Sequence, residues 1–338
     1  MRRSLFIGIA YSFIHFSVEV ASFYLLFSRI STNDYSWLFA LSFDALAFIP
    51  QSIFGIVSDK YQKLNLGAIG CLVMISSLII KNDVISLILL ATGNALVHVD
   101  GAQHTLRGTN GKITPNAVFV GGGSFGVITG QLLGKSGIAS GLWISVLLLV
   151  ISGVITCFVR NKNHALQQPA QFSITTDKSI GFIVLCAFIG VVVRGYIGYA
   201  IPTEWNKTAI QAVALFVFMG IGKILGGVLS DAIGFKKLTF LSFLVGLPFL
   251  LAGNNRMVVS LIGVAFFSMT MPVTVAILSS VFPKQPGFAF GITTLGLFVG
   301  IAPVFFIMPE TLLQHQIVVV VLTLIALPLI SVCIKKEC

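Results

Sequence analysis

The stretch GIVSDKYQK, residues 55–63, occurs a second time in altered form as GVLSDAIGFKK, residues 227–237. The two aspartates of these stretches, Asp59 and Asp231, are 172 residues apart, which is about half of the 338-residue chain. Each copy lies where a long apolar segment ends and a short basic turn leads into the next one. A motif that recurs after half the chain predicts two halves of similar architecture.

Apolar residues surround both copies of the motif. Charged residues make up 9% of the chain, hydrophobic residues make up 56%, and the mean hydropathy is +1.00. Soluble domains contain about 25% charged residues, and a soluble fold of this size would not hide so much apolar surface. In lipid the backbone polar groups must be satisfied internally, and long unbroken apolar runs favour helices over a barrel. The sequence therefore predicts an all-α membrane protein.

Twelve apolar segments are expected to span the membrane. Their limits are 4–28, 35–57, 65–80, 84–103, 114–134, 139–159, 179–200, 207–230, 238–253, 257–281, 287–308 and 315–334. The longer polar connection, residues 160–178, separates six spans from six. We therefore expect an N-terminal six-helix bundle over residues 1–160, a cytoplasmic linker over 161–178 and a C-terminal six-helix bundle over 179–338.

Glycines give a second repeat with nearly the same period. Three glycines of the fifth span are each matched by a glycine of the eleventh span 170 residues later. The pairs are Gly121 and Gly291, Gly126 and Gly296, and Gly130 and Gly300. Two repeats with one period predict parallel halves related by an axis along the membrane normal.

The basic residues predict the orientation. If the N-terminus is cytoplasmic, fourteen of the 21 lysines and arginines lie on that side and five on the other. Arg194 and Lys223 remain within spans. Positive residues collect on the cytoplasmic side of membrane proteins, so we expect both termini there. The net charge of +10 then reflects membrane orientation rather than nucleic-acid binding.

The pattern Gly-x-x-x-Asp followed by Lys or Arg resembles the loop between the second and third helices of each half in the major facilitator superfamily. The resemblance implies twelve transmembrane helices in two pseudo-symmetric six-helix bundles. It also implies that the motif is a conformational latch on the cytoplasmic side and that spans one, four, seven and ten line a central cavity. The latch residues are then Gly55, Asp59, Lys60, Gly227, Asp231 and Lys236.

An alternative for these residues is that Asp59 and the lysines only mark the cytoplasmic interface, as any loop charge would. The first copy also lacks a glycine after Asp59 and has Tyr61 and Gln62 there. We therefore expect its turn to differ from the turn that is usual in the family.

Ionisable residues inside spans are the candidates for chemistry, because a charge at the bilayer centre costs at least ~2.5–3.5 kcal/mol. Tyr11, His15 and Glu19 share one face of the first span. In the fourth span, His98 and Asp100 lie on different faces. The second span adds Asp44 and the seventh adds Arg194.

Glu19 and Asp100 are the leading candidates for proton coupling, with His98 and Asp44 as further candidates. We expect Arg194 to be a ligand anchor or a counter-ion. The full set of substrate-binding candidates is Tyr11, His15, Glu19, His98 and Arg194. A static buried ion pair that fixes helix register is the alternative for each charged residue.

Three basic positions have a blander interpretation. Lys223 is expected to extend towards the cytoplasmic end of its span. His104 and Arg107 are expected to anchor the fourth span at the interface. Many members of the superfamily carry an arginine deep in this span, whereas here the first arginine is Arg107. The chain departs from the family at this point.

The direction of transport depends on weaker signals. Gly122, Gly126, Gly130 and Gly134 recur every four residues in the fifth span, and the exporters of the superfamily carry a glycine-rich motif there. Symmetric close packing of helices is the alternative. GNALVH (93–98) and VVRGY (192–196) are similar to stretches of fosmidomycin-resistance-type exporters. These resemblances favour export.

The sequence predicts a secondary active transporter that moves a small organic solute by alternating access and is coupled to protons, with export slightly favoured. The alternative within this class is proton-coupled uptake of a small organic anion or nutrient. A non-transporting membrane sensor and a membrane-embedded enzyme are alternatives of other classes. A sensor would need an appended signalling segment, and an enzyme would need acids and histidines that converge on one bond or metal.

The expected partners are a small-molecule solute, protons and the lipid bilayer, and no nucleic acid. We expect a monomer in the bacterial plasma (inner) membrane, with no enzymatic activity and no cofactor. The five cysteines have no metal-ligand spacing, and no metal site is predicted. Nothing resembles a nucleotide-binding loop.

Overall fold

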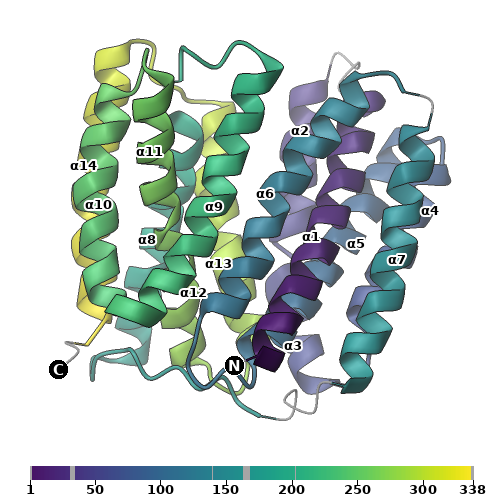
Figure 1. Ribbon diagram of the computed structural model, residues 1–338, viewed down its shortest axis with the longest axis horizontal. Coiled ribbons are helices and arrows are strands. Elements are labelled where there is room, and N and C mark those ends of the chain that lie inside the picture. Colours follow the sequence, from purple (N-terminus) through teal and green to yellow (C-terminus); the bar gives the residue numbers. More distant parts are fainter. Residues whose placement is uncertain (1, 31–34, 139, 163–167, 202, 336–338) are drawn as a thin grey trace.

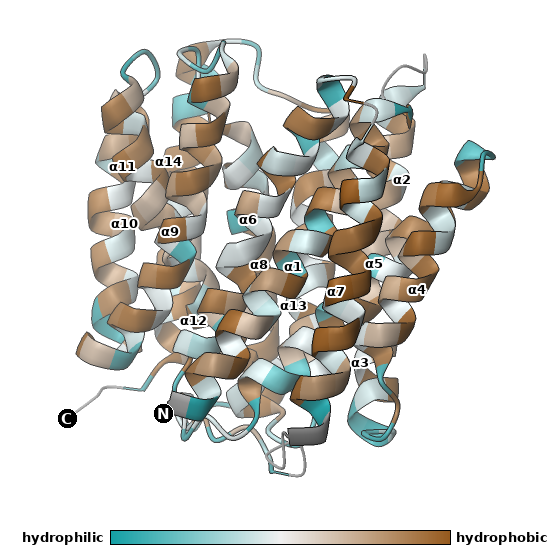
Figure 2. Cartoon of the chain, turned by 45° about the vertical axis from the view of Figure 1, so that its right-hand side comes forward, coloured by the Kyte–Doolittle hydropathy of each residue, from teal (hydrophilic) through white to brown (hydrophobic). Residues whose placement is uncertain are grey.

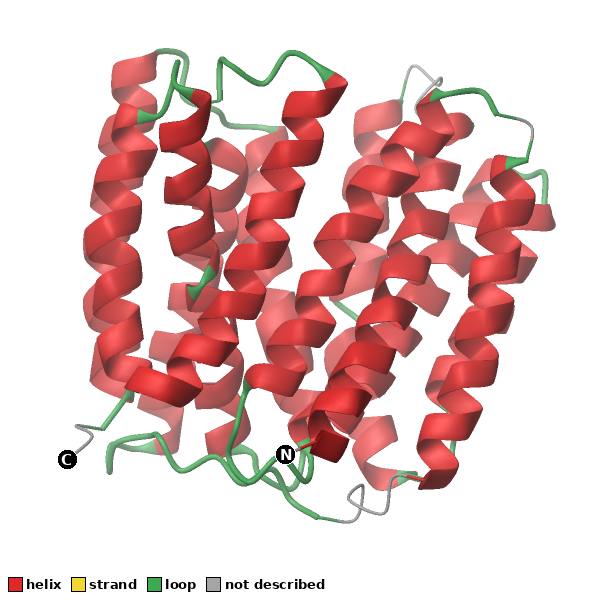
Figure 3. Cartoon of the chain, viewed as in Figure 1, coloured by secondary structure: helices red, strands yellow, loops and turns green. Residues whose placement is uncertain are grey.

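The computed structural model describes residues 2–30, 35–138, 140–162, 168–201 and 203–335. Within these ranges the regular structure is helical (Figure 3), apart from an isolated antiparallel bridge between Thr175 and Ile334. The helices are α1 (Arg2–Ser28), α2 (Ser36–Phe48), α3 (Gln51–Lys60), α4 (Leu66–Ile79), α5 (Asp83–Leu106), α6 (Thr114–Lys135), α7 (Gly141–Lys162), α8 (Ile180–Ala200), α9 (Ala209–Ile233), α10 (Phe235–Ala252), α11 (Met257–Ser268), α12 (Thr270–Val281), α13 (Pro286–Ile301), the 3-10 turn η3 (Ala302–Phe305) and α14 (Leu312–Cys333).

Every expected span contains helix. Eleven helical stretches in the described ranges are long and apolar enough to cross a membrane. The segment expected at 65–80 is the shorter α4, with 14 residues. Figure 2 shows apolar residues along the middle of the helices and polar residues towards both ends, which is the pattern of helices that cross a bilayer. The all-helical membrane architecture predicted from the sequence is confirmed.

Two of the membrane-spanning stretches are broken by prolines. The stretch from 36 to 60 consists of α2 and α3, which are separated by Ile49 and Pro50. The stretch from 257 to 281 consists of α11 and α12, and Pro272 lies in the first turn of α12. Proline has no N–H to donate to the preceding turn, so the helix stops before it and begins again.

The turns after the two motif copies differ. The second copy ends α9 at Ile233, and Gly234 takes a positive φ of 94° before α10 begins. Glycine adopts this backbone conformation without a steric cost. In the first copy Tyr61 caps α3 with a φ of −110°, and a longer turn follows. The two turns therefore have different backbone conformations.

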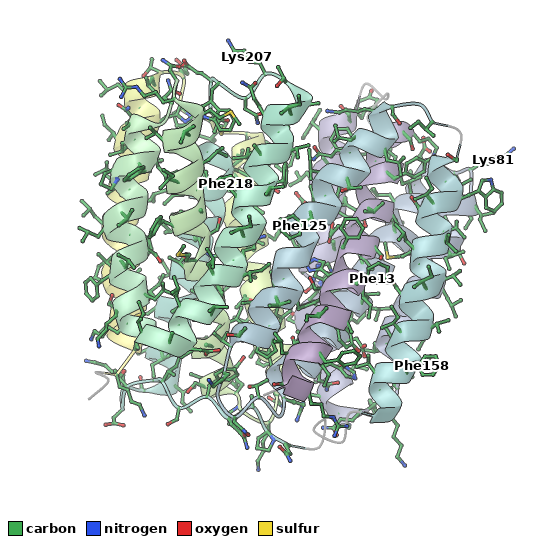
Figure 4. The ribbon with its side chains drawn as sticks, in the orientation of Figure 1. Phe13, Lys81, Phe125, Phe158, Lys207 and Phe218 are labelled. Atoms are coloured by element: carbon green, nitrogen blue, oxygen red, sulfur yellow. The ribbon has the colours of Figure 1, made fainter. Side chains whose placement is uncertain are left out.

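The helices of the first half of the chain lie on one side of Figure 1 and those of the second half lie on the other. Both ends of the chain lie at the same end of the molecule, here called the terminal end, and the opposite end is the far end. Lys81 and Lys207 extend from the far end, one from each half (Figure 4). Arg29, which follows α1, forms an ion pair with Asp83, Nε to Oδ1 at 2.8 Å.

The repeated glycines let helices approach each other closely. The four glycines spaced four residues apart in α6 face backbone carbonyls of α1 that are themselves four residues apart. These carbonyls belong to Ser12, Phe16, Val20 and Tyr24. A side chain at any of the four glycines would meet that backbone, so close packing accounts for this spacing.

The second set of glycines makes corresponding contacts. Gly121 of α6 faces Ile224 of α9, in the other half, while Gly291 of α13 faces Ser52 of α3, again in the other half. Gly300 of α13 faces the carbonyl of Val192 in α8. Helix α13 therefore packs against α8 and α3 as α6 packs against α1 and α9.

Part of the predicted linker is ordered on the second half. Residues 163–167 lie outside the described residues, whereas residues 168–176 run along the terminal end. Ala170 donates its N–H to Pro283 O at 2.7 Å, and Thr176 donates to Cys333 O at 3.1 Å. Ala170, Phe172 and Ile174 alternate inward as buried side chains. This segment is packed against the second half rather than extended into solvent.

Candidate functional site

The first motif copy joins the two halves at the terminal end. Asp59 is the second-last residue of α3, and its carboxylate accepts hydrogen bonds from the backbone N–H groups of Gly287 at 3.2 Å and Phe288 at 2.9 Å. These two groups belong to the first turn of α13, where backbone N–H groups have no partner within the helix. Asp59 therefore caps a helix of the other half, and its charge also complements the positive helix end.

The second copy makes the reciprocal contact. Asp231, near the end of α9, accepts hydrogen bonds from the N–H groups of Ile113 at 2.9 Å and Thr114 at 3.0 Å. The Thr114 hydroxyl donates to the same carboxylate at 2.5 Å. Ile113 and Thr114 form the N-terminus of α6 in the first half. Each half thus supplies a carboxylate that caps a helix of the other.

The motif glycines permit these contacts. A Cβ atom on Gly55 would meet the backbone of Gly287 and Phe288, and one on Gly227 would meet Ala117. Because only glycine leaves this space, α3 and α13, and likewise α9 and α6, approach closely enough for the carboxylates to reach the helix ends.

Arg107 supplies the cation beside Asp59. Its guanidinium forms an ion pair with Asp59 at 3.0 Å, with both side chains almost fully buried. It also donates to the carbonyl oxygens of Lys284 at 3.0 Å and Gln168 at 2.8 Å, both beyond the first half. Burial lowers the pKa of Arg107 from its ordinary value, and the neighbouring Asp59 opposes this shift. Arg107, predicted to anchor α5 at the interface, thus also connects α5 to three other segments of the chain.

The motif lysines are not part of this contact. Lys60 is exposed and lies over the Tyr61 ring, with Nζ 5.3 Å from the ring centroid. Lys236 is half-buried, and no hydrogen bond to Asp231 is found among the described residues. We define the carboxylate latch as Asp59, Asp231, Gly55, Gly227 and Arg107.

A second polar cluster surrounds Glu19 in the interior of the first half. One carboxylate oxygen, Oε1, lies 3.5 Å from His15 Nε2 and 3.4 Å from His98 Nε2. Asn94 Nδ2 donates to the same oxygen at 3.1 Å and to the Ser22 hydroxyl at 3.1 Å. The predicted residues His15, Glu19 and His98 thus come together, and we call them the Glu19 cluster.

The two histidine rings of the Glu19 cluster are fixed by backbone carbonyls. His15 Nδ1 lies 2.9 Å from Phe119 O, and His98 Nδ1 lies 2.9 Å from Asn94 O. A carbonyl oxygen only accepts, so each Nδ1 carries a proton. The ring centroids are 4.4 Å apart, with an interplanar angle of 79°. In neutral rings both Nε2 lone pairs are therefore turned towards Glu19.

Asp100 makes its contacts with a different set of residues. Its carboxylate accepts a hydrogen bond from the Tyr11 hydroxyl at 2.6 Å and forms an ion pair with Arg160 of α7 at 3.3 Å. His104 Nδ1 lies 3.7 Å from the same carboxylate and 2.8 Å from the Asp100 carbonyl. Tyr11, predicted beside His15 and Glu19, thus bonds to Asp100 instead. Arg160 and Asn94 were not among the predicted site residues.

Arg194 of α8 is buried and has no ion-pair partner among the described residues. The residue is only 9% exposed, and its Nε has no hydrogen-bond partner in the described chain. No ion pair or hydrogen bond to Arg194 is found among the described residues. An isolated buried charge is costly, so this guanidinium is a candidate for binding an anion from outside the chain.

Lys223 of α9 is half-buried. Its Nζ donates to the Ser124 hydroxyl of α6 at 2.9 Å, across the two halves. Its charge is repelled by Arg194 and attracted by Glu19. Lys223 therefore points into the interior rather than towards the terminal end, where the sequence analysis had placed it.

Asp44 of α2 is half-buried and is repelled by the charge of Glu19. Tyr199 of α8 interacts electrostatically with both carboxylates. Acidic groups of the first half, Glu19 and Asp44, thus interact electrostatically with groups of the second half, Lys223 and Tyr199.

The sequence matches no family model. It also matches no curated protein. The resemblance to fosmidomycin-resistance-type exporters therefore has no support from these comparisons.

Solved structures resemble the whole chain. The human organic anion transporter MFSD10 (TETRAN) matches with a TM-score of 0.65 and 16% identity, over 98% of this chain and 99% of that one. The major facilitator superfamily transporter FucP in the outward conformation matches with a TM-score of 0.62 and 14% identity, over 96% and 97%. A second structure of FucP, the E. coli fucose:proton symporter, matches with a TM-score of 0.61 and 15% identity, over 94% of this chain and 97% of that one. The chain has the fold of major facilitator superfamily transporters, as the loop motif predicted.

Proposed function

We propose that this chain is a secondary active transporter that moves a small organic anion across a membrane by alternating access, coupled to protons. The fold supports the transporter class, because its structural neighbours are transporters. The observation that carries the proposal is Arg194, a buried guanidinium without a partner in the described chain.

The anionic substrate follows from the charge balance of the interior. Glu19 is already engaged by Asn94 and faces two histidines, and Asp100 is paired with Arg160. No carboxylate of the described chain forms an ion pair with Arg194. Lys223 adds a second positive charge nearby. An anion that reaches both cations would gain charge-assisted hydrogen bonds that the empty protein lacks.

Proton coupling follows from the same arrangement. The carboxylate of Glu19 attracts Lys223 and so competes with an incoming anion for that cation. A proton on Glu19 removes the competition, so proton and anion are expected to favour each other's binding. Such positive linkage favours movement of both in one direction. With an inward proton gradient this is uptake, the alternative that the sequence analysis left open beside export.

The carboxylate latch supports alternating access. It holds the terminal end closed through contacts that are reciprocal between the halves, and these contacts must break for that end to open. We propose that the terminal end is cytoplasmic, that residues 1–160 and 179–338 form two six-helix bundles, and that residues 161–178 link them. A monomer in a bacterial inner membrane remains part of this proposal.

Flux in proteoliposomes tests the proposal. The purified chain would first be screened against organic anions, cations, sugars and amino acids by thermal shift, where a ligand at 100 times its Kd adds about 2.7 kcal/mol. The best ligand would then be offered to proteoliposomes with an imposed pH gradient. We expect accumulation of an anion on the alkaline side. Accumulation on the acidic side would indicate proton antiport and export, and binding without any flux would indicate a sensor.

A further inference from the structure

We propose that His15, Glu19 and His98 form a binding site for a divalent first-row metal ion such as Zn²⁺. The sequence analysis predicted no metal site, and transport by this fold does not require one. The inference therefore goes beyond the proposed function, and it depends only on the geometry of the Glu19 cluster.

Two of the three distances between the donor atoms match the edge of a tetrahedral site. Zinc–nitrogen bonds are about 2.0–2.1 Å long, so neighbouring ligand atoms of a tetrahedral site are about 3.4 Å apart. Glu19 Oε1 lies 3.5 Å from His15 Nε2 and 3.4 Å from His98 Nε2. All three ligand atoms lie within 4.8 Å of one another, and all three residues are buried. Three buried donor atoms this close together can share one metal ion.

The protein holds the ligands as metal sites usually do. A metal-bound histidine almost always donates its other ring N–H to a carbonyl or carboxylate, which fixes the ring and its tautomer. His15 and His98 each do so, through Phe119 O and Asn94 O. The side chain of Asn94 also donates to Glu19. A Cβ on Gly123 would meet the His15 ring, so the ring has little room to turn away.

A metal ion accounts for this arrangement better than a single proton does. Both Nε2 atoms are turned towards one carboxylate oxygen, and with Nδ1 protonated each Nε2 offers a lone pair. One proton between Glu19 and one imidazole leaves the other imidazole facing the oxygen lone pair to lone pair. Protons on both imidazoles would place two positive charges against one negative charge in a buried site. One divalent cation satisfies all three acceptors together.

The donor set selects the class of metal. Two imidazoles and a carboxylate suit Zn²⁺, Fe²⁺, Ni²⁺ or Cu²⁺, whereas Mg²⁺ and Ca²⁺ prefer oxygen ligands only. Three protein ligands leave one position for water or for an anionic group of a solute. Lys223, which interacts with both Glu19 and His98, adds a positive charge that weakens metal binding unless an anion accompanies the metal. Where the proposed proton coupling holds, a bound metal would occupy Glu19 and inhibit it.

Cobalt titration of the purified, chelator-treated full-length chain in detergent tests the proposal. Co²⁺ reports four-coordinate binding by its visible absorption. We expect one Co²⁺ per chain, displaced by Zn²⁺ but not by Mg²⁺. His98→Gln and Glu19→Gln should each weaken binding by more than 10-fold, and Asn94→Ala by about 10-fold, because it only positions Glu19. His104→Gln is the matched control, since that buried histidine lies beside Asp100, outside the cluster, and should leave binding unchanged.

Two results would overturn the proposal. One is the absence of a Co²⁺ absorption band that Zn²⁺ displaces. The other is a band whose midpoint is the same in Glu19→Gln as in the unmodified chain. If His98→Gln does not fold, the nearly isosteric Glu19→Gln decides the matter in the same titration. Zinc-dependent thermal stabilisation of the unmodified chain, lost in Glu19→Gln, would support the site independently.

Discussion

Asp59 and Asp231 make the same contact in opposite directions. Asp59 of the first half caps the N-terminus of α13 in the second, and Asp231 of the second half caps the N-terminus of α6 in the first. The two aspartates are 172 residues apart in sequence, yet each satisfies N–H groups that its partner helix cannot satisfy itself. The two halves are therefore joined at the terminal end by two equivalent contacts.

Asp231→Ala should shift the protein towards a state that is open at the terminal end. The variant loses a charged acceptor for three donors of Ile113 and Thr114, and each such bond contributes about 1.5–3 kcal/mol. Even a loss of ~1.4 kcal/mol changes the ratio of open to closed states tenfold. Spin-label distances between the terminal ends of α6 and α9 would measure this shift.

Asp177→Ala is the control for the latch, because Asp177 is an exposed carboxylate at the same end. It should leave the distances unchanged. Distances in Asp231→Ala that match those of the unmodified chain, together with unaltered transport, would show that Asp231 is not a latch.

Gly55→Ala should open the same end by a different route. The added Cβ would meet the backbone of Gly287 and Phe288, and backbone cannot move aside as a side chain does, so α3 and α13 must separate. The hydrogen bonds of Asp59 would lengthen as a consequence. Accessibility of a cysteine placed near Gly287 to a soluble thiol reagent would report the separation.

Gly181→Ala is the matched substitution for Gly55, because nothing lies within 4 Å of a Cβ at Gly181. It should change neither accessibility nor stability. Equal accessibility in Gly55→Ala and Gly181→Ala would mean that close approach of α3 and α13 does not hold the end closed.

Asp100→Asn should destabilise the protein without removing its proton dependence. Asp100 and Arg160 form an ion pair in which the carboxylate is 1% exposed, and removing one partner of a buried pair costs about 3–5 kcal/mol. Glu19→Gln should do the reverse, with proton dependence lost and stability little changed. Thermal unfolding and flux at two pH gradients separate the two outcomes.

Asp83→Asn is the control for the buried pair. Asp83 pairs with Arg29 with side-chain exposures of 35% and 29%, and a pair this exposed contributes about 0–1 kcal/mol. If Asp100→Asn lowers the melting temperature no more than Asp83→Asn and abolishes proton dependence, Asp100 is a coupling acid after all, as the sequence analysis had it.

Arg194→Met should stabilise the empty protein while removing its response to anions. The side chain is buried without a partner, and replacing costly buried charges with apolar groups of similar volume often gains about 1–4 kcal/mol. The thermal shift caused by the anionic ligand should disappear. An unchanged anion response, or a less stable empty protein, would contradict the assignment of Arg194 as the ligand anchor. Lys207→Met, at the far end (Figure 4), is the control and should change neither.

The residue types inside spans predict the members of the Glu19 cluster but not the residue that positions them. Glu19, His15 and His98 were all named from their residue types inside spans, and the structure brings them together. Asn94, which holds Glu19, gave no signal of its own, because an asparagine in an apolar helix does not reveal its partner. Asp100 and Glu19 are equivalent in sequence as acids inside spans. The rotation of α5 turns Asp100 towards Arg160 of α7 and His98 towards Glu19 of α1.

Composition and residue spacing alone predict the membrane environment, the helical spans and the two similar halves. These predictions need no knowledge of contacts between residues. They depend on the length of the apolar runs, the charge content and the spacing of the two Gly-x-x-x-Asp motifs. The partners of the buried charges depend on how the helices pack. Asp59 meets Arg107 and α13, Asp100 meets Arg160, and Arg194 meets no side chain of opposite charge in the described chain. Which buried charges are neutralised depends on how each helix is rotated and packed, and that is settled by the close glycine contacts between helices far apart in sequence.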